Sequence, residues 1–253
     1  DASEQIINTF TDKRLRLITT ANQGASKARN TGMSKASSNY ISLLDGDDLW
    51  DIDYLKTMQD AILKYPKIKV FAAALAQKYK SKTIPVNYNF TQDPLFKVHD
   101  YFKSSLKYSL LSSSSVVFNK AILSETGDFD VSIPSGQDTD LWIRIGLKFE
   151  IVFVNKILAF YRHVPNSLSN TTASPKKKPK FDKFLEEEKD NIYLKKLMDR
   201  NRYAMAILSK LNTNDEYASY YISNLNTKNI SIIQLILLKS PKWLLVLLLK
   251  LKS

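Results

Sequence analysis

The stretch YISLLDGDD, residues 40–48, runs an apolar segment directly into three carboxylates. In open α/β sheets, ligands bind beyond the carboxyl ends of the strands, so acidic residues at this point would face a binding site. Carboxylates beside a flexible glycine suit a hard divalent cation, which in turn neutralises a diphosphate. Asp45 and Asp47 are therefore candidate metal ligands. The alternative, which is the commoner one for an isolated Asp-x-Asp, is a polar turn that caps the next helix.

Short apolar runs alternate with helical patterns over the first 170 residues, which is typical of an α/β fold. The sequence predicts strands at 15–18, 40–44, 69–75 and 115–118, a strand pair within 151–158, and helices at 24–36, 53–63, 120–125 and 136–147. Ser135 is the predicted cap of the last of these helices. Residues 81–111 show no clear period and receive no assignment.

The composition is that of a soluble globular protein, with 44% apolar and 25% charged residues among 253. The chain has no cysteine, which excludes disulfide frameworks and thiolate metal sites and suits a reducing cytoplasm. No uninterrupted apolar stretch is long enough for a membrane-spanning helix. The chain begins at Asp1 without a methionine or an apolar signal stretch, so we expect a piece of a longer protein.

The net charge of +12 is concentrated in the C-terminal third. Residues 1–170 hold 21 basic and 17 acidic side chains, whereas residues 171–253 hold 16 and 8. Such an excess favours an anionic partner, either a lipid surface or nucleic acid. Composition also changes near residue 171. We therefore predict an α/β domain over residues 1–170 and a basic helical region over residues 171–253.

Two basic segments of the C-terminal region each have two interpretations. The lysine run at residues 176–180 is either a mobile loop or a lid beside the binding site. The leucine-rich segment at residues 240–252 is basic at both ends and carries Trp243, which suits a helix lying in an anionic membrane surface. A helix packed on the α/β domain or on another subunit explains the same pattern equally well.

A second candidate site is GQDTDLW, residues 136–142. Asp138 falls in the first turn of the predicted helix, where a carboxylate can take a proton from a hydroxyl. Acids in a first turn also complement the helix dipole, and that role is favoured for the segment alone. Arg29 is either a phosphate or base contact or a solvated residue. His163 is either a metal or diphosphate ligand or a structural histidine.

Six short blocks occur in an order that resembles the large inverting glycosyltransferase family two. They read DAS at 1–3, NQG and ARNTG within 22–32, LDGDD at 44–48, GDFD at 127–130, QDTDLW at 137–142, and YR with SLS within 161–169. Each block is weak evidence alone, but six in register over residues 1–170 form a specific signature. The resemblance implies a GT-A-like, Rossmann-like mixed sheet flanked by helices, with a C-terminal helical appendage.

The resemblance also implies roles for the residues that match the blocks. These are nucleotide-sugar binding by Asp1, Arg29 and Asp45, metal binding by Asp47, Asp45 and His163, acceptor binding by Gln137 and Trp142, and base catalysis by Asp138. The metal would be Mn or Mg, and no organic cofactor is expected.

Three departures from the family pattern stand out. The family's first strand and its nucleotide loop would precede position 1, so the donor site is expected to be incomplete. Gln137 stands where the family usually has Glu, which removes a negative charge near the acceptor. His163 directly follows Arg162, one position earlier than the family usually places its histidine.

The resemblance thus predicts a metal-dependent, hexosyltransferase-type glycosyltransferase that works with inversion. The donor would be a nucleoside-diphosphate sugar and the acceptor a saccharide or a lipid-linked saccharide. The expected setting is surface-polysaccharide or lipid-linked oligosaccharide synthesis in the cytoplasm, peripheral to the inner membrane face. A basic nucleic-acid-binding protein is disfavoured, because the carboxylates would repel phosphate without a metal. An inactive transferase-like scaffold is the other alternative.

Overall fold

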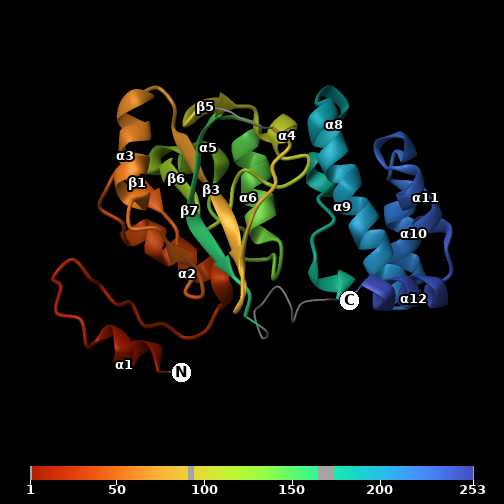
Figure 1. Cartoon of the computed structure of the whole chain (residues 1–253), viewed down its shortest axis with the longest axis horizontal. Coiled ribbons are helices and arrows are strands. Elements are labelled where there is room, and N and C mark those ends of the chain that lie inside the picture. Colours follow the sequence, from red (N-terminus) through yellow and green to blue (C-terminus); the bar gives the residue numbers. More distant parts are fainter. Residues whose placement is uncertain (1, 91–93, 165–173, 253) are drawn as a thin grey trace.

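A central sheet with helices on both faces forms the larger part of the molecule, and helices α8 to α12 stand beside it (Figure 1). The computed structural model describes residues 2–90, 94–164 and 174–252. Its α-helices are α1 Ser3–Ile7, α2 Gly24–Lys35, α3 Tyr54–Lys64, α4 Tyr101–Ser104, α5 Leu123–Thr126, α6 Gln137–Gly146, α8 Glu187–Asp190, α9 Ile192–Leu211, α10 Asp215–Ser223, α11 Ile232–Lys239 and α12 Lys242–Lys252. Within these described ranges, every helix is too short or too polar to span a bilayer.

The strands of the described chain form one mixed sheet in the order β1-β6-β3-β7-β2, with β4 paired to β3 and β5 to β7. Their bounds are β1 Tyr40–Ser42, β2 Leu49–Trp50, β3 Val70–Lys78, β4 Thr83–Pro85, β5 Phe96–His99, β6 Val116–Asn119 and β7 Ile151–Arg162. Strands β3 and β7 pair in parallel, and the other pairs are antiparallel. This mixed sheet between helices confirms the predicted α/β fold.

Strand β3 lies at the centre of the sheet because both of its faces are apolar. Its first seven residues are buried, as expected for a strand covered on two sides. Successive side chains point to opposite faces. Val70 and Ala72 therefore pack in the core that contains residues of α6 and α9. Phe71 and Ala73 pack in a second core beneath α3.

Helix α9 connects the C-terminal helices to the sheet. Its residues Leu194 and Met198 lie in the same core as α6, together with Phe181 and Phe184 from the preceding segment. Further along α9, Ala206 packs in a separate apolar cluster with residues of α10 and α11. The core on this face of the sheet thus contains residues from both sides of position 170, and the domain boundary there stays a prediction.

Helix α6 packs closely on α4. Helix α4 lies within residues 81–111, which the sequence left unassigned. A Cβ atom at Gly146, the last residue of α6, would overlap the ring of Tyr101. Glycine is therefore required at this crossing. The same stretch also supplies β4 and β5, two short strands whose periodicity is too brief to detect.

The prediction of a strand at residues 15–18 is wrong. These residues have no regular structure, and Leu15, Leu17 and Ile18 are 53%, 41% and 46% exposed. A strand is stabilised by a hydrogen-bonded neighbour and a buried face, and the structure pairs no described strand with this run.

The prediction of a strand pair within 151–158 is also wrong, because β7 is one continuous strand. The polar residues Asn155 and Lys156 lie in its middle. In the structure, the amide of Asn155 donates to the carbonyl of Leu95 at 2.8 Å. The ammonium of Lys156 donates to Asp53 at 2.9 Å. Both polar residues therefore have partners without breaking the strand.

Candidate active site

The three acids that follow β1 have different surroundings, and Asp48 is the structural one. Its Oδ2 accepts a hydrogen bond from Ser114 Oγ at 2.6 Å, and its Oδ1 accepts one from the amide of Arg162 at 3.0 Å. Burial raises the pKa of Asp48, and the negative charges of Asp47 and Asp45 add to the rise. Asp48 thereby ties the loop to the segment before β6 and to the end of β7.

Asp45 is paired with Arg29 of α2. The guanidinium Nη2 lies 2.6 Å from Asp45 Oδ1, and both side chains are partly buried. The Cζ atom of Arg29 also lies 5.3 Å from the centre of the Phe129 ring. Its Nη1 is buried and makes no hydrogen bond with any residue that the structure describes. Arg29 therefore keeps a donor that no described residue uses.

Asp47 is the acid of this loop that stays available. Its backbone carbonyl accepts a hydrogen bond from Arg162 Nε, while its carboxylate has no hydrogen-bond or ion-pair partner among the described residues. Magnesium is usually held by one or two carboxylates together with substrate phosphates and water. One free carboxylate beside a partly engaged one therefore fits such an ion. No group of three or more candidate ligands that could hold a metal occurs among the described residues.

The start of α6 places Asp138 opposite these acids. Gly136 occupies the N-cap position with φ +92°, a conformation that favours glycine, so the prediction that Ser135 caps this helix is wrong. Asp138 is half-buried, and its Oδ1 accepts a hydrogen bond from the amide of Thr139 at 2.8 Å. Its other oxygen has no partner among the described residues.

Asp140, two residues further on, has a structural role instead. It is fully buried and pairs with Arg144 at 2.9 Å and with Lys183 at 2.6 Å. Asp138 is therefore the first-turn acid of α6 whose carboxylate remains open to a ligand.

Asp138 and the acids of the loop after β1 line one cleft of about 390 Å³, which we call the carboxylate cleft. The predicted site residues that line it are Arg29, Asp45, Asp47, Gln137 and Asp138. They come from α2, from the loop after β1 and from the start of α6. The Oε1 atom of Gln137 is buried there without a partner in the described chain. Two sequence blocks about ninety residues apart thus meet at one site.

Sequence reasoning did not place Lys178 in this cleft. The sequence left residues 176–180 as either a mobile loop or a lid, and the structure places Lys178 of this run in the cleft. The Lys178 Nζ donates to Ser135 Oγ at 2.6 Å. Burial lowers the pKa of Lys178, and the negative charge of Asp138 opposes that fall. No spacing rule in the sequence links residue 178 to residue 138. The run of lysines was the only sequence signal that indicated a site here.

Two of the predicted site residues lie elsewhere, and a third is outside the described part of the chain. His163 stacks on Tyr79, with ring centres 4.3 Å apart and planes 10° apart, and does not line the carboxylate cleft. Trp142 is buried against Phe129, with ring centres 6.1 Å apart, and lines an adjoining pocket. Asp1 lies outside the described residues. The roles expected for all three stay predictions.

Two bacterial relatives resemble this chain along two thirds of its length. The glycosyltransferase GlyA of Streptococcus pneumoniae is 30% identical over 181 residues, which are 67% of this chain and 26% of GlyA. The putative teichuronic acid biosynthesis glycosyltransferase TuaG of Bacillus subtilis is 26% identical over 173 residues, 67% of this chain and 65% of TuaG. The chain therefore spans about a quarter of the first relative and less than two thirds of the second.

A solved structure and a family model agree with these relatives. Residues 1–349 of Staphylococcus aureus TarS in complex with UDP-GlcNAc match 88% of this chain and 60% of that one, with a TM-score of 0.51 and 16% identity. At that identity the match shows the fold alone, and it confirms the predicted GT-A-like architecture. The model of glycosyl transferase family 2 matches residues 1–127, half of the chain. This chain accordingly belongs to glycosyl transferase family 2.

Proposed function

We propose that this chain moves a sugar from a nucleoside-diphosphate sugar to an acceptor hydroxyl, with inversion at the anomeric carbon. One observation carries the proposal: Asp138 lines the same cleft as Asp45, Asp47 and the cations Arg29 and Lys178. A base for the acceptor and a charged cradle for a diphosphate are the two parts that a single displacement needs.

In this mechanism Asp138 takes the proton of the acceptor hydroxyl through its unpartnered oxygen. The acceptor oxygen forms a bond to the anomeric carbon while the bond from that carbon to the diphosphate oxygen breaks. The electron pair of the broken bond leaves with the nucleoside diphosphate. The positive charges of Arg29 and Lys178, which both line the cleft, stabilise the charge that develops there.

A divalent cation, Mn or Mg, would be held by Asp47 with help from Asp45, and it would supply Lewis-acid stabilisation of the diphosphate. The unpartnered carboxylate of Asp47 supports this assignment. Asp45 contributes less to a metal, because one of its oxygens is engaged by Arg29.

The donor and the biological setting that we propose are suggested by the proteins that this chain resembles. TarS was solved with UDP-GlcNAc, so this is the donor to test first. TuaG is named for teichuronic acid biosynthesis, so assembly of a cell-surface polysaccharide is the setting that we propose. We further propose that α11 and α12 rest on an anionic membrane surface. Ile233 and Trp243 support this, since they are 70% and 68% exposed within a strongly basic region.

Isothermal titration of UDP, with Mn present or with a chelator, tests the donor site. We expect wild-type protein to bind UDP at least about tenfold more tightly with Mn, and Asp47→Ala to lose that difference. Asp60→Ala is the control, because Asp60 is exposed on α3 and does not line the cleft. Equal affinity of wild type and Asp47→Ala with Mn would remove the metal from the proposal. No UDP binding at all would favour the inactive scaffold.

A further inference from the structure

A second pocket, of about 520 Å³, opens directly beyond Asp138. We call it the α9 pocket. It shares Ser112, Asp138, Thr139 and Tyr161 with the carboxylate cleft. A molecule whose hydroxyl reaches Asp138 from the side away from the carboxylates would therefore lie in this pocket.

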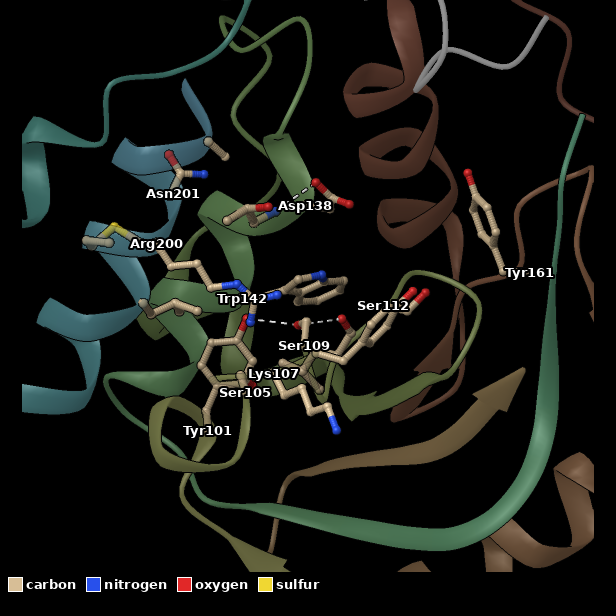
Figure 2. Close-up of a pocket in the computed structure, with 16 residues that line it drawn as sticks. Tyr101, Ser105, Lys107, Ser109, Ser112, Asp138, Trp142, Tyr161, Arg200 and Asn201 are labelled. Atoms are coloured by element: carbon tan, nitrogen blue, oxygen red, sulfur yellow. Dashed lines mark hydrogen bonds between the residues drawn. The ribbon is translucent and has the colours of Figure 1, made fainter. Parts of the chain in front are cut away.

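The far wall of the α9 pocket comes from the C-terminal region. Arg200 and Asn201 of α9 face Tyr161 across the pocket, with Asp138 at its rim (Figure 2). This wall is held firmly in place. Leu194 and Met198 of the same helix are buried in the sheet core, and Arg200 Nη1 donates to the carbonyl of Leu106.

A basic hollow of about 480 Å³ adjoins the α9 pocket. Lys107 and Arg200 line both spaces, and Lys196 and Lys228 line the hollow. Asp138 is the one acid among the described residues that line either space. The path that leads away from the base is therefore positively charged.

No described acid neutralises these four cations, although Arg200 donates to a backbone carbonyl. None of the four lies within 4.0 Å of a carboxylate in the part of the chain that the structure describes. By contrast, Lys195 on the same helix pairs with Asp199 at 2.6 Å. Cations without an acidic partner on the wall of a pocket can attract and bind an anion.

We propose that the acceptor is anionic: a saccharide or polyol that carries phosphate or carboxylate groups. This inference rests on the proposed function. The acceptor places its reacting hydroxyl at Asp138 and its anionic group at Lys107 and Arg200. The half-buried rings of Tyr108 and Tyr161 supply the flat surfaces on which a sugar ring packs. In this arrangement the C-terminal region selects the acceptor, while residues of the N-terminal part hold the donor.

Direct binding without any donor tests this. The probes are trigalacturonic acid, a synthetic glycerol-phosphate trimer and neutral maltotriose, each titrated calorimetrically into the full chain. We expect at least one anionic probe to bind about tenfold more tightly than maltotriose, and added salt to weaken it. Preference for one anionic probe over the other identifies the anionic group as carboxylate or phosphate.

Variants connect the binding to these residues. Lys107→Ala with Arg200→Ala should weaken the anionic probe about tenfold or more, while Arg200→Lys, which keeps the charge, should retain most of the affinity. Lys67→Ala is the control, because Lys67 is exposed and lines neither space. Melting temperatures confirm that each variant is folded.

Two results would overturn the inference: maltotriose binding as tightly as both anionic probes, or an anionic affinity that the double variant leaves unchanged. UDP affinity is measured in parallel and should be the same in the double variant as in wild type. If wild type binds the anionic probe but no UDP, the donor assignment fails while the anion site stands.

Discussion

Lys178 is a single side chain that alters the charge balance of the carboxylate cleft. The loop acids and Asp138 would repel a diphosphate, and Arg29 is already engaged with Asp45. Lys178 adds a cation on the Asp138 side of the cleft, where Ser135 holds its ammonium. It therefore offsets the acids at the point where the leaving group would carry its charge.

Substituting Lys178 by methionine removes this cation and keeps the length of the side chain. We expect UDP affinity to fall about tenfold, which is the worth of one charge-assisted hydrogen bond. The measurement is calorimetric titration of UDP with Mn present. Lys177→Met is the matched control, because its neighbour Lys177 is exposed and does not line the cleft. An equal loss in both variants would mean that the lysines act only through general charge.

At the scale of elements, the short helix α8 and the long helix α9 are joined by buried charges. Arg202 is 3% exposed. It pairs with Glu188 at 2.6 Å and with Asp199 at 3.2 Å. Lys195 contacts the same two acids, and Asn229 donates to Asp199 at 2.7 Å. This network fixes the helix that carries Arg200 into the α9 pocket.

Removing one partner of a buried pair leaves an uncompensated charge, which costs about 3–5 kcal/mol. We expect Arg202→Met to lower the free energy of unfolding by that amount, measured by urea denaturation. Glu188→Leu combined with Arg202→Met removes both charges, so the double variant should be clearly more stable than Arg202→Met alone. A double variant that is the less stable of the two would show that Glu188 stabilises the protein mainly through its other partner, Lys195.

Elements with a long period could be predicted from the sequence. The helices expected at 24–36 and 53–63 are α2 and α3, and the strand expected at 69–75 is β3. Residues 15–18 have the apolar content of a strand, but strand pairing depends on a neighbour that local sequence does not specify. Strand β7 runs on as one strand through its polar residues Asn155 and Lys156, whose tertiary partners only the fold supplies.

The same contrast holds for the candidate site. Arg29, Asp45, Asp47 and Asp138 were predicted from blocks in register, and the structure brings them to one cleft. Arg200 was not predicted, and Lys178 only as part of a run that is either a loop or a lid, because their place is set by the packing of the C-terminal region on the sheet. Their segments carry no spacing that refers to the cleft.

The whole molecule exposes apolar side chains at its C-terminal end. Ile232, Ile233 and Ile236 on α11 are 79%, 70% and 59% exposed, and Trp243 on α12 is 68% exposed. Residues 171–253 also carry 16 basic and 8 acidic side chains. Apolar side chains within a basic surface support the proposed contact with anionic lipid.

Replacing Ile233 and Trp243 together by glutamate should abolish co-sedimentation with vesicles that contain phosphatidylglycerol. Wild type should bind these vesicles and bind pure phosphatidylcholine vesicles much less, since part of the attraction is electrostatic. Leu55→Glu is the control, because Leu55 is 62% exposed on α3. Unchanged sedimentation of the double variant would favour another role for this surface, such as contact with a second subunit.

The central claim, that Asp138 is the catalytic base, is tested most directly by Asp138→Asn. Asparagine has nearly the same size and can still accept the hydrogen bond from the amide of Thr139, but it cannot take a proton at neutral pH. With a donor and acceptor that the wild type turns over, we expect transfer to fall by about 10²–10⁴. UDP affinity and melting temperature should stay close to wild type. Near wild-type transfer by a variant that is less stable by about 1 kcal/mol would show that Asp138 only stabilises the first turn of α6.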